Sequence, residues 1–247
     1  MKSFYELVDP LPSLGSGFDL AHGTTVLGLR FDRGCLMLAD RRATAANFIV
    51  YDHADKIYPL DDSTLIAISG AYARSLEICR MLKHSFAYYR RMSLNELSTE
   101  GKLMEISRAL ATNLPMAAQG IGAFLPIVCC YDPLTEDFGL YFFDAAGARF
   151  QNGEYACAGS GSERIRGVFE FLTRTQKPWV ECTLNEVLER GLRMLDIAAD
   201  LDSATGGLAK ILPTARVLTN EGSRPVEVDE VRLAASRIIQ KELFSGA

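Results

Sequence analysis

The sequence lacks the motifs that mark most hydrolases, nucleotide-binding enzymes and metal sites. It contains no GxSxG, HExxH, Walker A or GxGxxG pattern, which removes the usual signatures of serine esterases, zinc peptidases, P-loop enzymes and dinucleotide-binding proteins. Its six cysteines form no CxxC pair. They are therefore expected to be reduced core thiols rather than zinc ligands or a disulfide framework.

An excess of positive charge and long apolar runs are also missing. The 26 Lys and Arg residues are outnumbered by 31 Asp and Glu, so nucleic acid is not expected as a partner. The longest apolar stretches, such as 121–131, are too short to span a membrane. The first residues lack the basic start and apolar centre of a secretory signal. We therefore expect a cytoplasmic protein, and 247 residues with 48% hydrophobic composition fit one folded domain.

Apolar periodicity predicts blocks of strands that alternate with paired helices. Strands are expected over 24–32 and 35–40, joined by a turn at Arg33-Gly34, and over 121–131, 138–143 and 149–157. Helices are expected over 71–92 and over 103–114, where Pro115 should end the helix, and a capping box of Thr183 and Glu186 begins another. This order indicates an α+β chain whose antiparallel sheets are covered by helix layers.

Residues 1–23 are rich in Pro, Gly and Ser and form an expected appendage to a domain over 24–247. A hydroxyl at the junction between this appendage and the first strand could be activated without a histidine. A threonine at a chain's N-terminus carries nucleophile and base in one residue, because its α-amine has a pKa of about 7.7–8.0. Cleavage after Gly23 would turn Thr24 into such a residue. Taken alone, however, Thr24 is better explained as the β-branched start of a strand.

Further segments carry a resemblance to a known family, and they occur in the family's order. They are Thr24-Thr25-Val26, 38–44 (LADRRAT), 55–59 (DKIYP), Ser69-Gly70-Ala71, 158–162 (AGSGS) and 202–207 (DSATGG). Together they resemble the catalytic β-subunits of bacterial 20S proteasomes, which are N-terminal-nucleophile hydrolases. The resemblance covers essentially all of 24–230. It implies a four-layer αββα sandwich, with two antiparallel sheets flanked by helix pairs.

The resemblance also implies a role for each matching residue. Thr24 would be the nucleophile, and the backbone N–H of Gly70 would help to hold the oxyanion. Lys56 would lower the pKa of the Thr24 hydroxyl, with Asp40 as the carboxylate that keeps it charged. The groups that would orient the terminal amine are Ser160, Asp202 and Thr205, the last of which stands where the family more often has serine. The plainer alternatives are a surface ion pair for Asp40 and Lys56, a turn residue for Ser160 and a helix-end charge for Asp202.

Substrate contacts follow from the same resemblance. The backbone at Thr44 would pair with an extended peptide. The residues that match the primary specificity pocket are Ala43, Ala54, Ile68 and Tyr72. Because none of them is charged, cleavage after apolar residues is expected. Tyr72 is bulkier than the residues often found there, so it either narrows the pocket or points into the first helix.

The implied function is that of a threonine endopeptidase made as a zymogen. Autocatalytic cleavage between Gly23 and Thr24 would release residues 1–23 as a propeptide, and unfolded polypeptides would then be hydrolysed through an acyl-enzyme on Thr24, without metal or cofactor. The implied partners are a homo-heptameric β-ring stacked with a second β-ring and with α-rings, and an ATP-dependent ring unfoldase. The alternatives are a non-catalytic ring subunit, the shorter six-membered bacterial relative and a small-molecule amidase.

Overall fold

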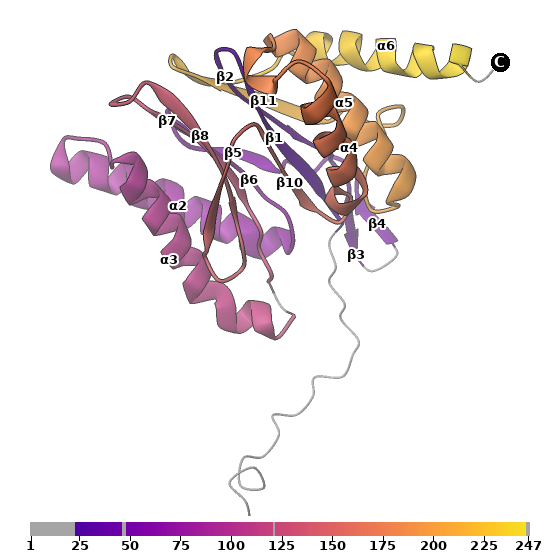
Figure 1. Cartoon of the computed structure of the whole chain (residues 1–247). Helices are drawn as coiled ribbons and strands as arrows, with labels where there is room; N and C mark the ends of the chain where they lie inside the picture. The colour runs from indigo at the N-terminus through magenta and orange to yellow at the C-terminus, as the bar shows by residue number, and fades with distance from the viewer. Residues whose placement is uncertain (1–22, 46–47, 121, 246–247) are drawn as a thin grey trace, which may run out of the picture.

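Two five-stranded antiparallel sheets lie face to face, and helices cover the outer face of each (Figure 1). The structure is a computed structural model that describes residues 23–45, 48–120 and 122–245. The expected appendage therefore lies outside the described residues, apart from Gly23. The four-layer αββα sandwich expected from the sequence is confirmed.

The strands of the two sheets come from separate parts of the chain. The first sheet has the order β10-β1-β2-β11-β12, with bounds Tyr155–Gly159, Thr25–Phe31, Gly34–Ala39, Thr214–Thr219 and Gly222–Pro225. The second sheet has the order β5-β6-β7-β8-β9, with bounds Ile57–Asp61, Thr64–Ala67, Ile127–Asp132, Asp137–Phe143 and Arg149–Asn152. A short hairpin of β3 (Ala43–Ala45) and β4 (Phe48–Tyr51) lies beside them.

The central strands are buried on both faces because alternate side chains enter two different cores. In β2, Leu36 and Leu38 pack toward the helices, whereas Cys35, Met37 and Ala39 pack between the sheets. The sheets approach closely at Gly28 of β1, where an added Cβ would lie 2.7 Å from Cδ1 of Leu140. A third core fills the space between the second sheet and its helices. Three apolar layers therefore join four layers of secondary structure.

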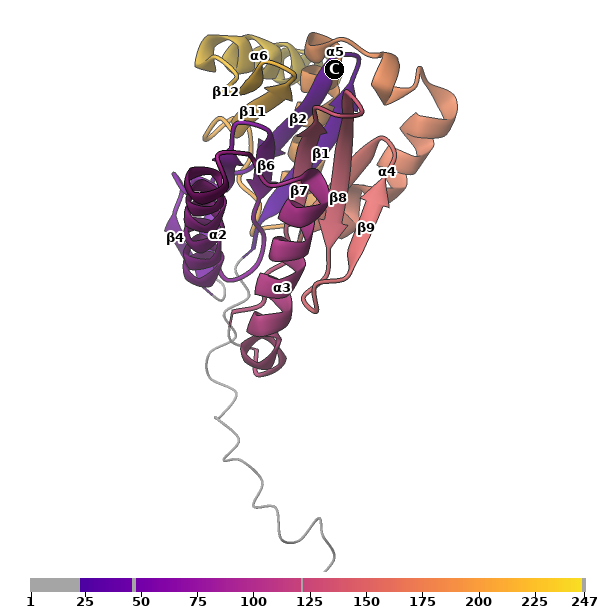
Figure 2. The same ribbon diagram turned by 90° about the vertical axis from the view of Figure 1, so that its left-hand side faces the viewer.

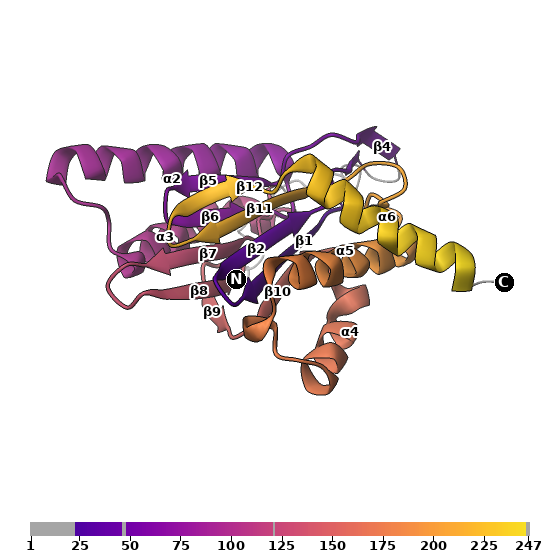
Figure 3. The same cartoon turned by 90° about the horizontal axis from the view of Figure 1, so that it is seen from above.

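Each outer face has its own set of helices. The helices α2 (Tyr72–Ser93) and α3 (Thr99–Ala118) cover the second sheet, as Figure 2 shows from their side. The first sheet is covered by α4 (Ser162–Thr175), α5 (Leu184–Leu201) and α6 (Val228–Ser245), with α6 alongside α5 (Figure 3). The predicted capping box of Thr183 and Glu186 is present at the start of α5.

Four predicted boundaries are wrong. Pro115 lies inside α3, and the chain leaves the helix at Gly120, whose φ of +74° favours glycine. The expected strand over 149–157 is two strands, since the chain crosses from one sheet to the other at Gly153-Glu154. The expected strand over 121–131 begins only at Ile127, after Pro126, and Ile121 is outside the described residues. The first hairpin turns at Asp32-Arg33, one residue earlier than predicted.

Candidate active site

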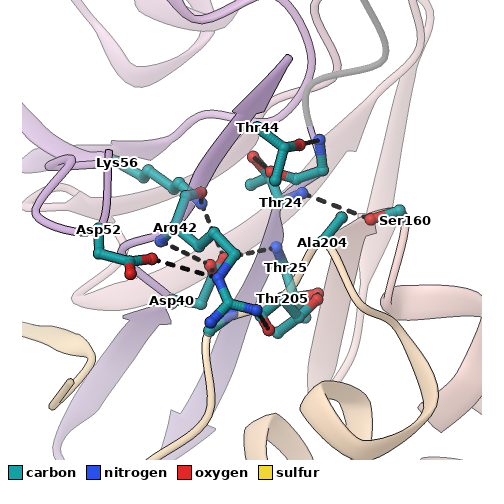
Figure 4. Close-up of polar contacts among 12 residues, drawn as sticks. Thr24, Thr25, Asp40, Arg42, Thr44, Asp52, Lys56, Ser160, Ala204 and Thr205 are labelled. Atoms are coloured by element: carbon teal, nitrogen blue, oxygen red, sulfur yellow. Dashed lines mark hydrogen bonds and ion pairs between the residues drawn. The ribbon is translucent and has the colours of Figure 1, made fainter. Parts of the chain in front are cut away.

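Strand pairing brings the predicted site residues to one end of the sandwich. Thr24 precedes β1, Asp40 follows β2 and Ser160 follows β10, and these three strands are neighbours in the first sheet. Because they run antiparallel, the start of β1 lies beside the ends of the other two. Lys56 precedes β5 in the second sheet and bonds directly to Asp40. Residues far apart in the sequence thus form one polar cluster (Figure 4).

Asp40 and Lys56 form a buried ion pair. Their side chains are 0% and 1% exposed, and Lys56 Nζ lies 2.8 Å from Asp40 Oδ1. Asp40 also accepts hydrogen bonds from the backbone N–H groups of Thr25, Arg42 and Gly206, at 2.8, 2.9 and 3.1 Å. Lys56 Nζ donates to the carbonyl of Arg42 at 2.6 Å. The surface ion pair that the sequence left open is therefore excluded.

Burial has a direct effect on Lys56. It lowers the pKa of the ammonium below its ordinary value, and the attraction of Asp40 opposes that shift. The Lys56 ammonium is therefore a positive charge in a buried site of low dielectric constant, where its interaction with a nearby negative charge is weakly screened. Such a site suits the stabilisation of an oxyanion or alkoxide.

Thr24 is 4% exposed and lies at the centre of this cluster. Its hydroxyl donates to the carbonyl oxygen of Gly23 at 2.7 Å. Its backbone N–H donates to Ser160 Oγ at 3.4 Å. One residue earlier in the chain, the N–H of Gly23 donates to Thr44 Oγ1 at 3.0 Å. The nucleophile candidate thus hydrogen-bonds to the peptide bond whose cleavage would free its amine.

Three hydroxyls and one carboxylate form a second network beside Thr24. Ser160 Oγ and Thr205 Oγ1 both donate to Asp202 Oδ2, at 2.6 and 2.7 Å. Because Thr205 donates to Asp202, its oxygen is left to accept from Thr25 Oγ1 at 2.7 Å. Threonine at position 205 thus joins Asp202 to Thr25 through its hydroxyl. Ser160 lies in the turn after β10 and Asp202 is the C-cap of α5, as the plainer alternatives had it, and a hydrogen bond also joins the two in one network.

Gly70 has a backbone conformation that few other residues adopt. Its φ is +100°, and an added Cβ would lie 2.1 Å from the carbonyl oxygen of Ala123. The hydrogen bonds that hold this segment come from the N–H groups of its neighbour Ala71 and of Leu125. No hydrogen bond within the described residues links Gly70 to Thr24 or Lys56. Gly70 faces Phe124 in an isolated β-bridge, and neither of the two hydrogen bonds of that bridge uses the N–H of Gly70.

The predicted substrate residues lie around the β3 hairpin and the start of α2. Ala43 and Thr44 are in β3, with a bulge between them. Ala54 and Ile68 are buried, and the N–H of Ile68 donates to the carbonyl of Lys56 at 2.8 Å. Tyr72 packs against the core beneath α2 and places its hydroxyl 3.4 Å from that of Tyr58. Of the two orientations that the sequence left open for Tyr72, the structure shows the one directed into the helix layer.

Sequence reasoning missed Arg42 and Asp52. The guanidinium of Arg42 donates to Asp52 at 3.2 Å and to the carbonyls of Ser203 and Thr205 at 2.9 and 3.0 Å. Asp52 also accepts from Lys210 at 2.7 Å, and these cations lower the pKa of its carboxyl. Arg42 therefore ties the 202–206 loop to the Asp40 and Lys56 pair. The only signal for Arg42 in the sequence was its position two residues after Asp40, and no feature of the sequence indicated Asp52.

Two further features bear on the chemistry. In residues 23–45, 48–120 and 122–245, no cluster of three or more His, Cys, Asp or Glu side chains has the arrangement of a metal site. None of the helices in this part of the chain has the length and apolar character that crossing a bilayer requires. The polar groups that the structure places at the site are hydroxyls, backbone amides, the buried pair of Asp40 and Lys56, the Asp202 carboxylate and the Arg42 guanidinium.

Known proteins are similar to this chain over most of its length. A family model described as proteasome subunit matches residues 20–212. A proteasome subunit beta from Streptomyces griseus is 31% identical over 236 residues, which cover 94% of this chain and 82% of that protein. The proteasome subunit beta of Acidothermus cellulolyticus is 31% identical over 93% of this chain and 79% of its own length. That of Acidimicrobium ferrooxidans is 32% identical over 88% and 78%.

These matches run through every segment on which the sequence resemblance depended up to residue 212, and the αββα sandwich agrees with them. The resemblance to bacterial proteasome β-subunits is thus confirmed. The chain belongs to the proteasome subunit family.

Proposed function

We propose that this chain is a threonine endopeptidase subunit, cut between Gly23 and Thr24 and then using Thr24 as its nucleophile. One observation carries the proposal: the Thr24 hydroxyl hydrogen-bonds to the Gly23 carbonyl, in a cluster that also holds the buried pair of Asp40 and Lys56. Membership of the proteasome family supports it. On this proposal residues 1–23 are a propeptide, and 24–247 are the peptidase domain.

Self-cleavage would proceed through an ester. The Thr24 Oγ1 attacks the carbonyl carbon of Gly23, an Oγ1–C bond forms, and the C–N bond to Thr24 breaks. The hydroxyl proton ends on that nitrogen, which leaves as the α-amine of Thr24. Water then hydrolyses the ester, which gives a Gly23 carboxylate and restores the Thr24 hydroxyl. The hydroxyl is held next to the carbonyl that it would attack, which lowers the entropic cost of the reaction.

The mature site would repeat this chemistry on a peptide substrate. The freed amine accepts the hydroxyl proton, since its pKa is close to neutral pH. The Lys56 ammonium stabilises the developing negative charge, and the Gly70 N–H is the proposed donor to the oxyanion. Ser160 already contacts the nitrogen that would become the amine, and Asp202, which also accepts from Thr205, holds Ser160 in place. The peptide would pair with the backbone at Thr44.

Three other functions are less well supported. A non-catalytic ring subunit would have no chemical use for Thr24 together with the buried pair of Asp40 and Lys56. The shorter six-membered relative and a small-molecule amidase fit less well, because the curated β-subunits match 88% or more of this chain. The hypothesis of a threonine peptidase gives a role to each of the predicted site residues in the cluster.

Family membership implies assembly into multi-subunit rings. We place the chain in a homo-heptameric β-ring, stacked on a second β-ring and on α-rings, with an ATP-dependent ring unfoldase that supplies unfolded polypeptide. Large exposed apolar side chains support extensive contacts, among them Phe48, Val50, Tyr88, Met92 and Leu94. All six cysteines are free, as in a reducing cytoplasm.

The assembled protein is expected to hydrolyse peptides after apolar residues. The pocket candidates Ala43, Ala54 and Ile68 offer no partner to a charged side chain, whose burial without one is unfavourable. We expect kcat/KM for a reporter peptide with leucine before the scissile bond to exceed that for lysine or glutamate by at least about ten-fold. Peptides that differ only at that residue give the comparison. Equal or faster hydrolysis after a charged residue would contradict the pocket assignment, and no hydrolysis of any of the three would contradict the proposed function.

A further inference from the structure

The residue before the nucleophile is held on three sides. Its N–H donates to Thr44 Oγ1 at 3.0 Å, and its carbonyl accepts from Thr24 Oγ1 at 2.7 Å. The third contact is steric. A Cβ added to Gly23 would lie 1.8 Å from the Cβ of Ala204 and 2.8 Å from its Cα. The Ala204 methyl therefore occupies the space that a side chain at position 23 would need (Figure 4).

Ala204 cannot move away easily, because the loop around it is fixed on both sides. Its N–H donates to Asp202 Oδ1 at 3.2 Å. The Arg42 guanidinium holds the carbonyls of Ser203 and Thr205, the residues immediately before and after it. A flexible side chain could give way to a new methyl group, but a methyl on a backbone fixed in this way cannot.

We propose that Ala204 is the residue that restricts position 23 to glycine and holds the scissile peptide in place for self-cleavage. The inference rests on the proposed function and names a residue that acts in maturation alone. Once the bond is cut, residue 23 is gone and the Ala204 methyl has nothing left to press against. Its methyl group has no polar atom that could move a proton or hold the oxyanion, so we expect the later hydrolysis of substrates not to depend on it.

The experiment separates maturation from hydrolysis with the substitution Ala204→Val. In the full chain, co-expressed with its α-type partner, the added methyls displace Gly23 from Thr44 and Thr24. We expect the appearance of the cleaved chain, followed by intact mass, to slow by about ten- to a hundred-fold. The same variant is also made as residues 24–247 behind a removable tag whose protease leaves Thr24 first. This pre-cut form is expected to hydrolyse peptide within about two-fold of the pre-cut wild type.

Two further variants sharpen the test. Ala209→Val adds the same methyls to an exposed residue of the following segment, and its cleavage is expected at the wild-type rate. Gly23→Ala presses on Ala204 from the other side and is expected to slow cleavage as Ala204→Val does. Because residue 23 is absent from the mature chain, this variant changes maturation only.

The outcomes distinguish the inference from the proposal beneath it. Cleavage of Ala204→Val or Gly23→Ala at the wild-type rate overturns the inference while the wild type still matures. Loss of activity in pre-cut Ala204→Val also overturns it, since Ala204 would then serve hydrolysis. A wild-type chain that stays full length in the assembled particle overturns the proposed function, and the inference with it.

Discussion

Replacement of Thr24 by alanine is expected to abolish both self-cleavage and peptide hydrolysis while the chain still folds and assembles. The variant removes the only hydroxyl that touches the Gly23 carbonyl in the described structure. Loss of a nucleophile leaves little beyond binding and charge stabilisation, so we expect kcat/KM to fall by at least about 10⁴-fold. Intact mass and hydrolysis of a reporter peptide measure the two effects on the same particle.

Thr24→Ser is the matched control for this variant. It keeps the hydroxyl and removes only a methyl group, so it should still be cleaved and should still hydrolyse peptide. Gel filtration shows whether both variants assemble. Turnover by the alanine variant above the background of an empty preparation would contradict the mechanism, because no other hydroxyl is proposed to attack.

Replacement of Lys56 by alanine is expected to remove most activity even in a chain that already begins at Thr24. The ammonium is the positive charge in the buried cluster that bonds directly to Asp40. Removing one preorganised donor of this kind costs about 10²–10³-fold in rate. Asp40 keeps its three backbone donors, so the pre-cut variant is expected to fold with reduced stability. Its kcat/KM and its midpoint of urea unfolding are the two measurements.

Lys102 supplies the control for this change, because it is a second buried lysine in an ion pair. Its Nζ lies 2.7 Å from Asp61 Oδ2 and from Ser63 Oγ, between α3 and the turn from β5 to β6. Lys102→Ala should lower the unfolding midpoint, as Lys56→Ala does, yet retain peptidase activity. Near wild-type activity in the Lys56 variant would mean that the site has been misplaced.

Lys56 also sets an alkaline limit on activity. Burial lowers the pKa of Lys56 below 10.5, against the attraction of Asp40. Its charge is present below that lowered pKa and is lost as the pH rises through it. Activity that requires the ammonium therefore falls on the alkaline side before an ordinary lysine would titrate.

Most of the fold and the cluster could be predicted from the sequence, because each signal was local or carried by a family motif. The capping box at Thr183 and Glu186 acts within one helical turn. The strands around Thr24 and Asp40 follow from their apolar residues, and the motifs that contain Asp40, Lys56 and Asp202 predicted residues that the structure brings into one place.

What could not be predicted depends on contacts between distant segments. Arg42 bonds to a loop more than 160 residues away, and no local pattern distinguishes it from its neighbour Arg41. Residues 149–157 are divided between two sheets because β9 pairs with β8, whereas β10 pairs with β1. The end of α3 is a local exception: the helix continues past Pro115 to Ala118, and Gly120 then takes the left-handed conformation. The contact of Ala204 with Gly23 is likewise invisible in the sequence.

The central claim is that Thr24 becomes the N-terminus of the working chain. The most direct test is the intact mass of this chain purified from a particle assembled with its α-type partner. We predict a mass lower than that of the full chain by the mass of residues 1–23. A full-length mass in a completely assembled particle that hydrolyses peptide would contradict the account, because the α-amine of Thr24 would then still be locked in its peptide bond.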